Sequence, residues 1–205
     1  MKGLQKGAGM TAGKVEIAHV GDEATMVSVL TLAFATDPAS RWSWPDSQTY
    51  LETFPLFIKA FGGKAFAHSS AHRIDGVGAA LWLPPGVHPD EEVMDALIRS
   101  TIPKHLLEDT FAVIEQMERH QPEEPHWYLP LIGIDPSQHG RGYGSVLLEH
   151  GLAVCDRDNA LAYLDSTNPL NNPFYERHGF ELLGSIQVGS SPPIYPMLRR
   201  PGRRG

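Results

Sequence analysis

Apolar residues recur at helical spacing through the N-terminal half of the chain and predict a series of amphipathic helices. The first is expected to begin after the N-cap residue Asp22 and to end at Asp37-Pro38; its apolar positions are Met26, Val27, Leu30, Ala33 and Phe34. Residues 41–45 are expected to form an aromatic loop, and a second helix over residues 50–61 to stop at Gly62-Gly63. Two more helical stretches are predicted between residues 89 and 120, separated at Ile102-Pro103.

Shorter apolar runs predict the strands of a sheet. They cover residues 15–18, 65–69, 77–83, 127–134, 161–164, 180–188 and 195–199. Asp75-Gly76 predicts the turn of an antiparallel hairpin, whereas the runs at 127–134 and 161–164 are joined by a helix and are expected to pair in parallel. The positions of that helix predicted to face the core are Leu147, Leu148, Gly151, Leu152 and Cys155. Pro196 indicates that the last strand lies at an edge or carries a bulge.

The composition is that of one ordinary globular domain. The 205 residues are 41% hydrophobic and 20% charged, and no apolar run approaches the roughly 20 residues that span a bilayer. The net charge of −7 argues against nucleic-acid binding, and the single cysteine, Cys155, fits core packing in a reducing cytoplasm. We therefore expect a cytoplasmic protein that binds neither membrane nor nucleic acid and is a monomer or homodimer.

Residues 1–13, which lack an apolar signal segment, are expected to be a disordered extension. Residues 14–200 are expected to form a single domain and residues 201–205 a tail; Met10 is an alternative start.

The segment from Ile132 to Ser145 carries the most informative pattern in the chain. An apolar strand runs into a loop with three alternate glycines, Gly140, Gly142 and Gly144, and a helix begins at once. Glycine lets backbone amides come close to a ligand, and amides at a helix N-terminus favour an anion. The loop is therefore predicted to hold a phosphate group.

Spacing limits which phosphate ligand fits this loop. A P-loop needs Gly-Lys-Ser/Thr, which does not occur in the chain, and a dinucleotide-binding loop needs a glycine where Ser145 stands. Asp165 keeps the dinucleotide alternative open, because it lies near the end of the following strand, where such folds place the acid that binds ribose. A tight glycine turn without any ligand is the remaining alternative.

Two segments of the chain resemble motifs of the GNAT acetyltransferases. His139 to Gly144 matches the motif Gln/Arg-x-x-Gly-x-Gly/Ala, with His139 in place of Gln or Arg. Asn171 to Phe180 resembles the second motif, a short helix that ends in Tyr-Glu-Arg-x-Gly-Phe. Together with Glu124 to Leu129, this segment is most similar to the puromycin N-acetyltransferase-like members of the family. The resemblance extends from Val15 to Arg199.

The resemblance implies an α/β (α+β) fold of the GNAT type, in which a mixed, mostly antiparallel sheet of six to seven strands has a parallel, splayed central pair and is flanked by helices. It implies acetyl-CoA as cosubstrate and transfer of the acetyl group to a primary amine of a small molecule, such as an antibiotic-like or other xenobiotic amine. The residues expected to contact acetyl-CoA are Ile132, Gly133, Ile134, His139, Gly140, Arg141, Gly142, Tyr143, Gly144, Ser145, Asn168 and Asn171.

Acetyl transfer needs a proton for the leaving thiolate and a base for the attacking amine. Tyr175 is the candidate acid, because a phenol can protonate a thiolate whose thiol has a pKa of about 8.5. Asp165 is the candidate base, but Tyr128, His126 and Glu124 lie near the same strand ends and are alternatives. Asp165 could equally cap the helix that follows.

The acceptor pocket is expected to come from residues 34–45, from the second helix and from residues 82–85. The candidates are Phe34, Trp42, Trp44, Trp82 and Tyr128. The tryptophans suit an aromatic or cationic substrate, although ordinary core packing explains each of them equally well. The histidines and the cysteine match no metal-binding spacing. Two other functions fit the same motifs: acetylation of a protein N-terminus or lysine, and binding of CoA without catalysis.

Overall fold

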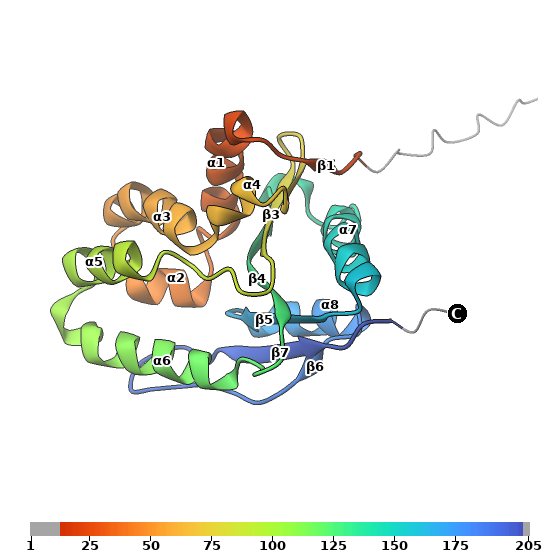
Figure 1. Ribbon diagram of the computed structural model, residues 1–205. Coiled ribbons are helices and arrows are strands. Elements are labelled where there is room, and N and C mark those ends of the chain that lie inside the picture. The colour runs from red at the N-terminus through yellow and green to blue at the C-terminus, as the bar shows by residue number, and fades with distance from the viewer. Residues whose placement is uncertain (1–12, 203–205) are drawn as a thin grey trace, which may run out of the picture.

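The computed structural model describes residues 13–202, which form a seven-stranded mixed sheet flanked by helices (Figure 1). The strands are β1 (Glu16–Ile17), β2 (Ala71–Ile74), β3 (Gly78–Leu83), β4 (His126–Ile134), β5 (Leu161–Ser166), β6 (Glu181–Leu182) and β7 (Tyr195–Arg199). Their order is β1-β2-β3-β4-β5-β7-β6, and among these strands only β4 and β5 pair in parallel. The predicted fold class is confirmed. Most of the predicted extension and tail lies outside the described residues, and the single domain over 14–200 stays a prediction.

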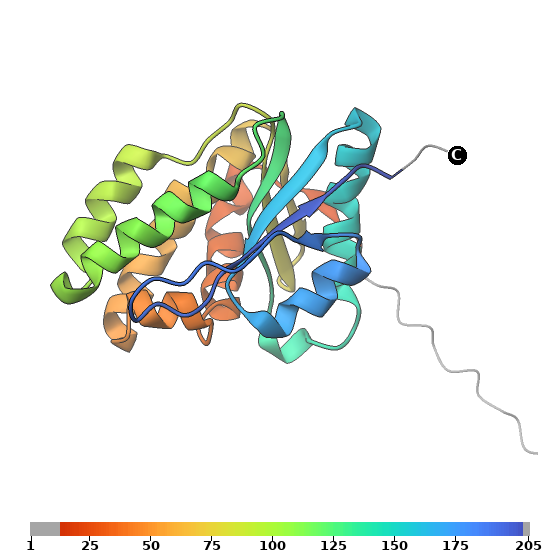
Figure 2. The same ribbon diagram turned by 90° about the horizontal axis from the view of Figure 1, so that it is seen from below.

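Helices cover both faces of the sheet (Figures 1 and 2). α1 (Glu23–Ala33), α3 (Ser47–Gly62) and α4 (Lys64–Ala67) pack against β3 and β4 on one side, which we call the α1 face. α2 (Pro38–Ser43), α5 (Glu91–Thr101) and α6 (Leu107–His120) lie on the same side. α7 (Tyr143–Asp158) covers the opposite side, the α7 face, together with α8 (Asn172–Arg177). Within residues 13–202, no helix is long and apolar enough to cross a membrane.

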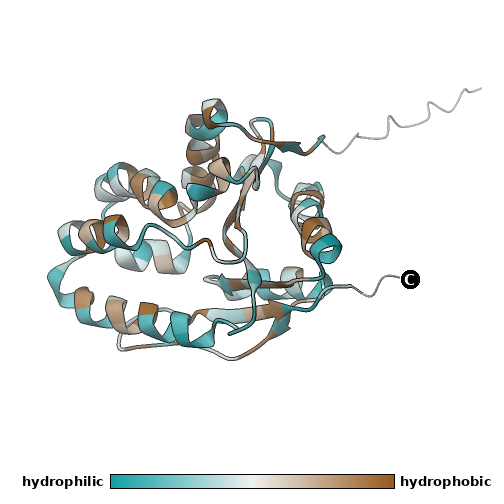
Figure 3. Ribbon diagram, in the orientation of Figure 1, coloured by the Kyte–Doolittle hydropathy of each residue, from teal (hydrophilic) through white to brown (hydrophobic). Residues whose placement is uncertain are grey.

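Alternation along the strands divides the core between the two faces. On β3, Leu81 and Leu83 pack with the helices of the α1 face, whereas Trp82 packs with α7. α7 buries all of the positions predicted to face the core. Burial raises the pKa of the Cys155 thiol to about 12, so this cysteine is a packing residue. Figure 3 shows hydrophobic residues along the central strands and both kinds of residue on the helices, as expected of amphipathic helices.

Two local predictions in the N-terminal half are wrong. The aromatic stretch is not a loop, because α2 runs through it to Ser43. Asp37 begins α2 by accepting a hydrogen bond from Ser40 N at 3.0 Å, and Pro38 suits the first helical turn. Residues 65–69 were expected to form a strand, but α4 occupies most of them, and the hairpin partner of β3 is β2.

The C-terminal strands also differ from the prediction. β7 is not an edge strand, since it lies between β5 and β6. β6 pairs with β7 only at Met197 and Leu198, and the carbonyl of Pro196 accepts from Leu183 N at 2.9 Å. Because Pro196 has no N–H, it accepts this hydrogen bond from Leu183 but donates none in return, and the β6–β7 ladder ends there. The rest of residues 180–188 forms no strand beyond an isolated bridge between Ile186 and Ile194.

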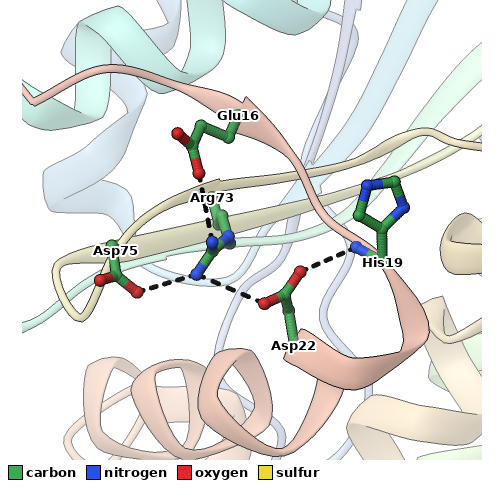
Figure 4. Close-up of polar contacts among 5 residues, drawn as sticks. All are labelled: Glu16, His19, Asp22, Arg73 and Asp75. Atoms are coloured by element: carbon green, nitrogen blue, oxygen red, sulfur yellow. Dashed lines mark hydrogen bonds and ion pairs between the residues drawn. The ribbon is translucent and has the colours of Figure 1, made fainter.

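Arg73 joins the first strand to the hairpin and to the start of α1 (Figure 4). Its guanidinium lies 3.1 Å from Glu16, 2.8 Å from Asp75 and 3.4 Å from Asp22. Asp22 is the N-cap residue of α1, as predicted, but its carboxylate accepts from His19 N at 2.9 Å and holds the preceding turn instead of capping an amide of α1. This cluster holds the two-residue strand β1 at the edge of the sheet.

Candidate active site

β4 and β5 pair at one end and separate at the other. Their parallel ladder joins only residues 126–128 to residues 161–163, although β4 continues to Ile134 and β5 to Ser166. Where the ladder ends, β4 carries a register shift against β3 and contains Pro130, which has no N–H to donate. The second half of β4 therefore borders a gap instead of a paired strand.

A cavity of about 830 Å³ lies at this gap, on the α1 face. Its walls come from α2, α3, α5, α6 and α8, from the segment just after α1, from β4 and the end of β5, and from the loop before β7. This volume is in the usual range for small-molecule sites. The predicted site residues that line it are Phe34, Trp42, Trp44, Tyr128, Ile132, Asp165, Asn171 and Tyr175.

Asp165 lies near the end of β5, between two tyrosine hydroxyls. Tyr163 Oη donates to Oδ1 at 2.8 Å, and Tyr128 Oη lies 3.4 Å from Oδ2. Burial raises the pKa of Asp165 to about 7, while the hydrogen bonds from Tyr163 and Tyr128 and the nearby His120 lower it. Burial also raises the pKa of both tyrosines, so they stay protonated. A carboxyl group with a pKa near 7 on a cavity wall can accept a proton at neutral pH.

Tyr175 reaches the same cavity from the opposite face of the sheet. It lies on α8 and packs in the core of the α7 face, with its ring centroid 5.2 Å from Phe174 and 5.9 Å from Phe180. It nevertheless lines the cavity. Burial, and secondarily the charge of Asp37, raises its pKa above the usual value, so the phenol holds its proton at neutral pH. The β4–β5 gap thus brings an acid from one face and a carboxyl group from the other into one space.

The glycine loop leaves room for a ligand at the start of α7. Gly140 and Gly142 have φ values of +75° and +83°, and no heavy atom lies within 4 Å of where a Cβ would stand. Gly142 is the N-cap of α7, and among residues 13–202 no side chain caps the amides of its first turn. Gly144 faces Phe174 at 3.6 Å, an ordinary contact. Uncapped amides, open space and the helix dipole fit the pyrophosphate of a CoA molecule.

The side chain that departs from the family motif is engaged within the protein. His139 Nε2 lies 3.0 Å from the carbonyl oxygen of Ile134 and ties the glycine loop to the end of β4. Arg141 is exposed, whereas Tyr143 and Ser145 are half-buried at the first turn of α7. Gly133 is required for packing, since a Cβ there would stand 2.6 Å from Ala33 of α1.

Two predicted site residues have other roles in the structure. Trp82 does not line the cavity: it is fully buried on the α7 face, with its indole directly against Gly151. The side chain of Asn168 accepts from Leu170 N at 3.1 Å and caps the turn that leads into α8. Asn168 thus performs the capping that was the alternative role for Asp165.

Sequence reasoning missed two residues of the site. Asp37 is buried on the cavity wall, and its second oxygen accepts from the Thr167 hydroxyl at 2.6 Å, which joins α2 to the loop after β5. Its place before Pro38 was a signal for a helix start that could have been used. Tyr163 stands two residues before Asp165 on one strand, and this spacing places both on the same face.

The comparisons with known proteins point to one superfamily. Residues 107–180, which include the glycine loop and Tyr175, match the model of the acetyltransferase (GNAT) family. An uncharacterized N-acetyltransferase of Schizosaccharomyces pombe is 28% identical over 149 residues, with 62% of this chain and 58% of that relative covered. The chain thus matches less than two thirds of the length of its curated relative.

Solved structures share the fold over nearly the whole chain. A Corynebacterium glutamicum protein described as a histone acetyltransferase and related acetyltransferase is 27% identical, with a TM-score of 0.65 over 95% of this chain and 99% of its own. A Drosophila melanogaster polyamine N-acetyltransferase that forms N-acetylagmatine is 15% identical, with a TM-score of 0.60 over 91% and 99%. An N-acetyltransferase from Thermoplasma acidophilum, solved with coenzyme A, is 12% identical, with a TM-score of 0.53 over 93% and 99%.

Together these matches confirm the GNAT fold and support an N-acetyltransferase of the GNAT superfamily. The likeness to the puromycin N-acetyltransferase-like members is not confirmed by them and stays a prediction. The family match begins only at α6, so it leaves most of the cavity wall on the α1 face outside its range.

Proposed function

Taking the chain as an N-acetyltransferase with the GNAT fold, we propose that it transfers the acetyl group of acetyl-CoA to a primary amine of a small molecule, of the antibiotic-like or other xenobiotic kind. The reaction proceeds by direct attack in a ternary complex. The observation that carries this proposal is that Asp165 and Tyr175 come from opposite faces of the sheet and line one cavity at the β4–β5 gap. α5 and α6 help to wall that cavity, which favours a compact acceptor over a protein chain.

The donor is held by backbone groups more than by side chains. The amides from Gly140 to Ser145 bind the pyrophosphate, and the stretch of β4 around Ile132, which pairs with β3 but not with β5, bonds the pantetheine arm as a neighbouring strand would. Asn171, on the cavity wall, is the side chain placed to contact the arm. Acetyl-CoA supplies the acetyl group as a thioester. The fit rests on the uncapped start of α7 and the open space at Gly140 and Gly142.

Each proton transfer has a residue with a suitable protonation state. Asp165 accepts the proton that the amine loses as its nitrogen bonds to the acetyl carbon. Tyr128 and Tyr163 hold the carboxyl group in place for this step. Tyr175 donates its proton to the sulfur as the carbon–sulfur bond breaks, and it is protonated at neutral pH because of burial. The products are an amide and free CoA; Asp165 then releases the proton that it accepted to water, and Tyr175 regains a proton from water.

Thermal unfolding with acetyl-CoA, CoA, NAD and ATP in parallel tests the donor site. A ligand at about 100 times its Kd stabilises the folded protein by roughly 2.7 kcal/mol. Stabilisation by acetyl-CoA and CoA, but not by NAD or ATP, is expected. Stabilisation by NAD alone would contradict the proposal and return Asp165 to the role of a ribose ligand.

A matched pair of glycine variants makes the test specific to the loop. Gly142→Ala and Gly76→Ala both place a side chain at positive φ with no atom within 4 Å of the new Cβ, but Gly76 lies in the β2–β3 turn. Both variants should lose similar stability without ligand. Only Gly142→Ala should lose the shift with CoA; an equal loss in both variants would remove the loop from the donor site.

Turnover with free amines and with peptides separates the acceptor classes. Release of CoA on adding small primary amines, without acetylation of peptide N-termini or lysines, is the expected result. Acetylated peptides and inert small amines would overturn the acceptor assignment. CoA binding without acetylation of either class of acceptor would contradict the proposed catalysis and favour the alternative of a CoA-binding protein.

A further inference from the structure

One wall of the cavity is a continuous row of aromatic rings that starts at the candidate base. Tyr128, whose hydroxyl lies 3.4 Å from Asp165, has its ring centroid 5.9 Å from that of Phe61. The row continues to Phe57 at 5.0 Å and to Trp44 at a further 5.5 Å. An acceptor whose amine lies at Asp165 would therefore extend its body along ring faces and edges.

The opposite wall is also apolar. α6, which lies across from α3, contributes Phe111, Ile114 and Met117, whereas α5, which packs against α3, adds Met94 and Ile98 to the aromatic side. Neither set includes a side chain that could pair with a buried charge. A bulky apolar group between the two walls would gain the free energy of burial on both sides.

Charged groups are distributed unevenly around this space. Of the described residues that line the cavity, none is a lysine or an arginine. Two carboxyl groups of the lining, the buried Asp37 and the half-buried Asp165, lie at the sheet end, because Asp37 bonds Thr167 just after β5. The remaining acidic residues of the lining, Glu91, Glu118, Glu123 and Glu124, are exposed, and Asp95 is paired with Arg99 at 2.8 Å.

This distribution excludes two kinds of amine. A carboxylate or phosphate on the acceptor would meet no lysine or arginine of the described lining and would face carboxyl groups at the sheet end and at the exposed rim. A second ammonium, several carbons from the first, would lie among aromatic and aliphatic side chains; Asp95, the half-buried carboxylate of α5 in the described lining, is already paired with Arg99. The exposed acidic rim attracts any cation, but the interior accepts one only at the sheet end.

On the basis of the proposed function, we infer that the acceptor is a monoamine with a bulky aromatic or aliphatic body and no anionic group. It enters with its amine toward Asp165 and places its body between the aromatic row and α6. Linear polyamines and amino acids with a free carboxylate are poor acceptors.

Two pairs of amines test this inference on the wild-type enzyme. Hexylamine and 1,6-diaminohexane differ by the second ammonium, and 2-phenylethylamine and phenylalanine differ by the carboxylate. The value of kcat/KM should be at least about tenfold higher for the first member of each pair, because the second buries an unpaired charge. Equal or higher values for the diamine or the amino acid would overturn the inference and leave the proposed function intact. Acetylation of none of the four, with CoA binding retained, would overturn both.

A variant that supplies the missing partner sharpens the test. Met117→Glu adds a carboxylate to the α6 wall and should reduce the preference for hexylamine over 1,6-diaminohexane at least about fivefold. Gln116→Glu adds the same charge to the neighbouring position of the helix, away from the cavity lining, and should leave the preference unchanged. An equal effect of both variants would assign the preference to general surface charge. The wild-type comparison decides the inference if Met117→Glu does not fold.

Discussion

On the α7 face of the sheet, Trp82 lies so close to Gly151 that any Cβ would clash with its indole, whereas on the α1 face aromatic rings surround a cavity of about 830 Å³. The same strands supply both surfaces, since alternate residues of β3 point to opposite sides. One face is filled by α7, while the other is covered by several helices that leave space between them.

The difference shows how a sheet can be both a stable core and a reaction site. Dense packing on the α7 face fixes α7, whose N-terminus carries the glycine loop, and supports α8, which carries Tyr175. The space on the α1 face is where we propose that the acceptor binds, with Asp165 on its wall. The β4–β5 gap connects the two faces, so the residues proposed to hold the donor and those proposed to hold the acceptor meet there.

The largest expected effect comes from the residue that crosses between the faces. Tyr175→Phe keeps the ring in the α7-face core but removes the proton donor, so kcat should fall by roughly 100-fold or more. The Kd of acetyl-CoA should stay within about threefold of wild type, because the backbone holds the donor. Steady-state kinetics together with calorimetric titration of acetyl-CoA measure the two quantities.

Tyr195→Phe is the matched control, since it removes a tyrosine hydroxyl from β7 outside the cavity lining. It should leave kcat unchanged. Unchanged turnover of Tyr175→Phe would remove Tyr175 from the chemistry.

The next effect concerns the carboxyl group of the α1 face. Asp165→Asn should lower kcat/KM by about 100-fold at pH 8. In the wild type, kcat/KM should rise with pH through about 7, because Asp165 must be deprotonated to act and its pKa is raised to about 7. The variant should lack this inflection, and pH–rate profiles from pH 5.5 to 9 measure it. A wild-type profile that is flat through pH 7 would argue against Asp165 as the base.

The same pKa shift affects stability. The folded-state pKa of Asp165 is raised above its unfolded value, so its contribution to stability is fully present below about pH 4 and is lost as the pH rises to about 7. Asp165→Asn should therefore gain stability relative to wild type between pH 4 and pH 7. Urea unfolding at both pH values measures the difference, and an opposite trend would contradict the burial of an ionisable carboxyl group at this position.

A smaller effect tests the packing of the α7 face. Gly151→Ala should lower the free energy of unfolding by about 1–3 kcal/mol, because its methyl group meets the indole of Trp82. Gly144→Ala is the control on the same helix, where the new methyl group makes only an ordinary contact at 3.6 Å, and it should cost no stability. Urea unfolding measures the free energy of unfolding of both variants. Equal stability of the two would show that the packing around Trp82 and Gly151 can rearrange to admit a methyl group, which would contradict dense packing on the α7 face.

The smallest effect is expected at the loop where the family motif is altered. His139→Gln restores the motif and releases the carbonyl of Ile134, yet the Kd of CoA should change by less than about tenfold, because one hydrogen bond is exchanged for another. Calorimetric titration measures it. A larger change would mean that this side chain, and not the backbone, dominates donor binding.

The α7 face was the more predictable part of the molecule. Helical spacing identified every core position of α7, and the alternate glycines identified its start, because both are local patterns. The parallel pairing of β4 with β5 also followed from the helix between them.

The α1 face was less predictable, because it depends on which side of the sheet a residue faces. Trp82 was assigned to the pocket, but one step along β3 separates it from the residues that face α1. Asp37 was taken as the end of a helix, although it begins the next one and reaches Thr167 across 130 residues of sequence. No local pattern contains a contact of that kind.

A crystal structure of the complex with CoA tests the central claim most directly. The claim predicts the pyrophosphate at the start of α7, the pantetheine arm beside Ile132 in the β4–β5 gap, and the sulfur within about 4 Å of the Tyr175 hydroxyl. A CoA molecule bound elsewhere, or a sulfur that lies outside the gap and away from Tyr175, would contradict the account of how the two faces meet.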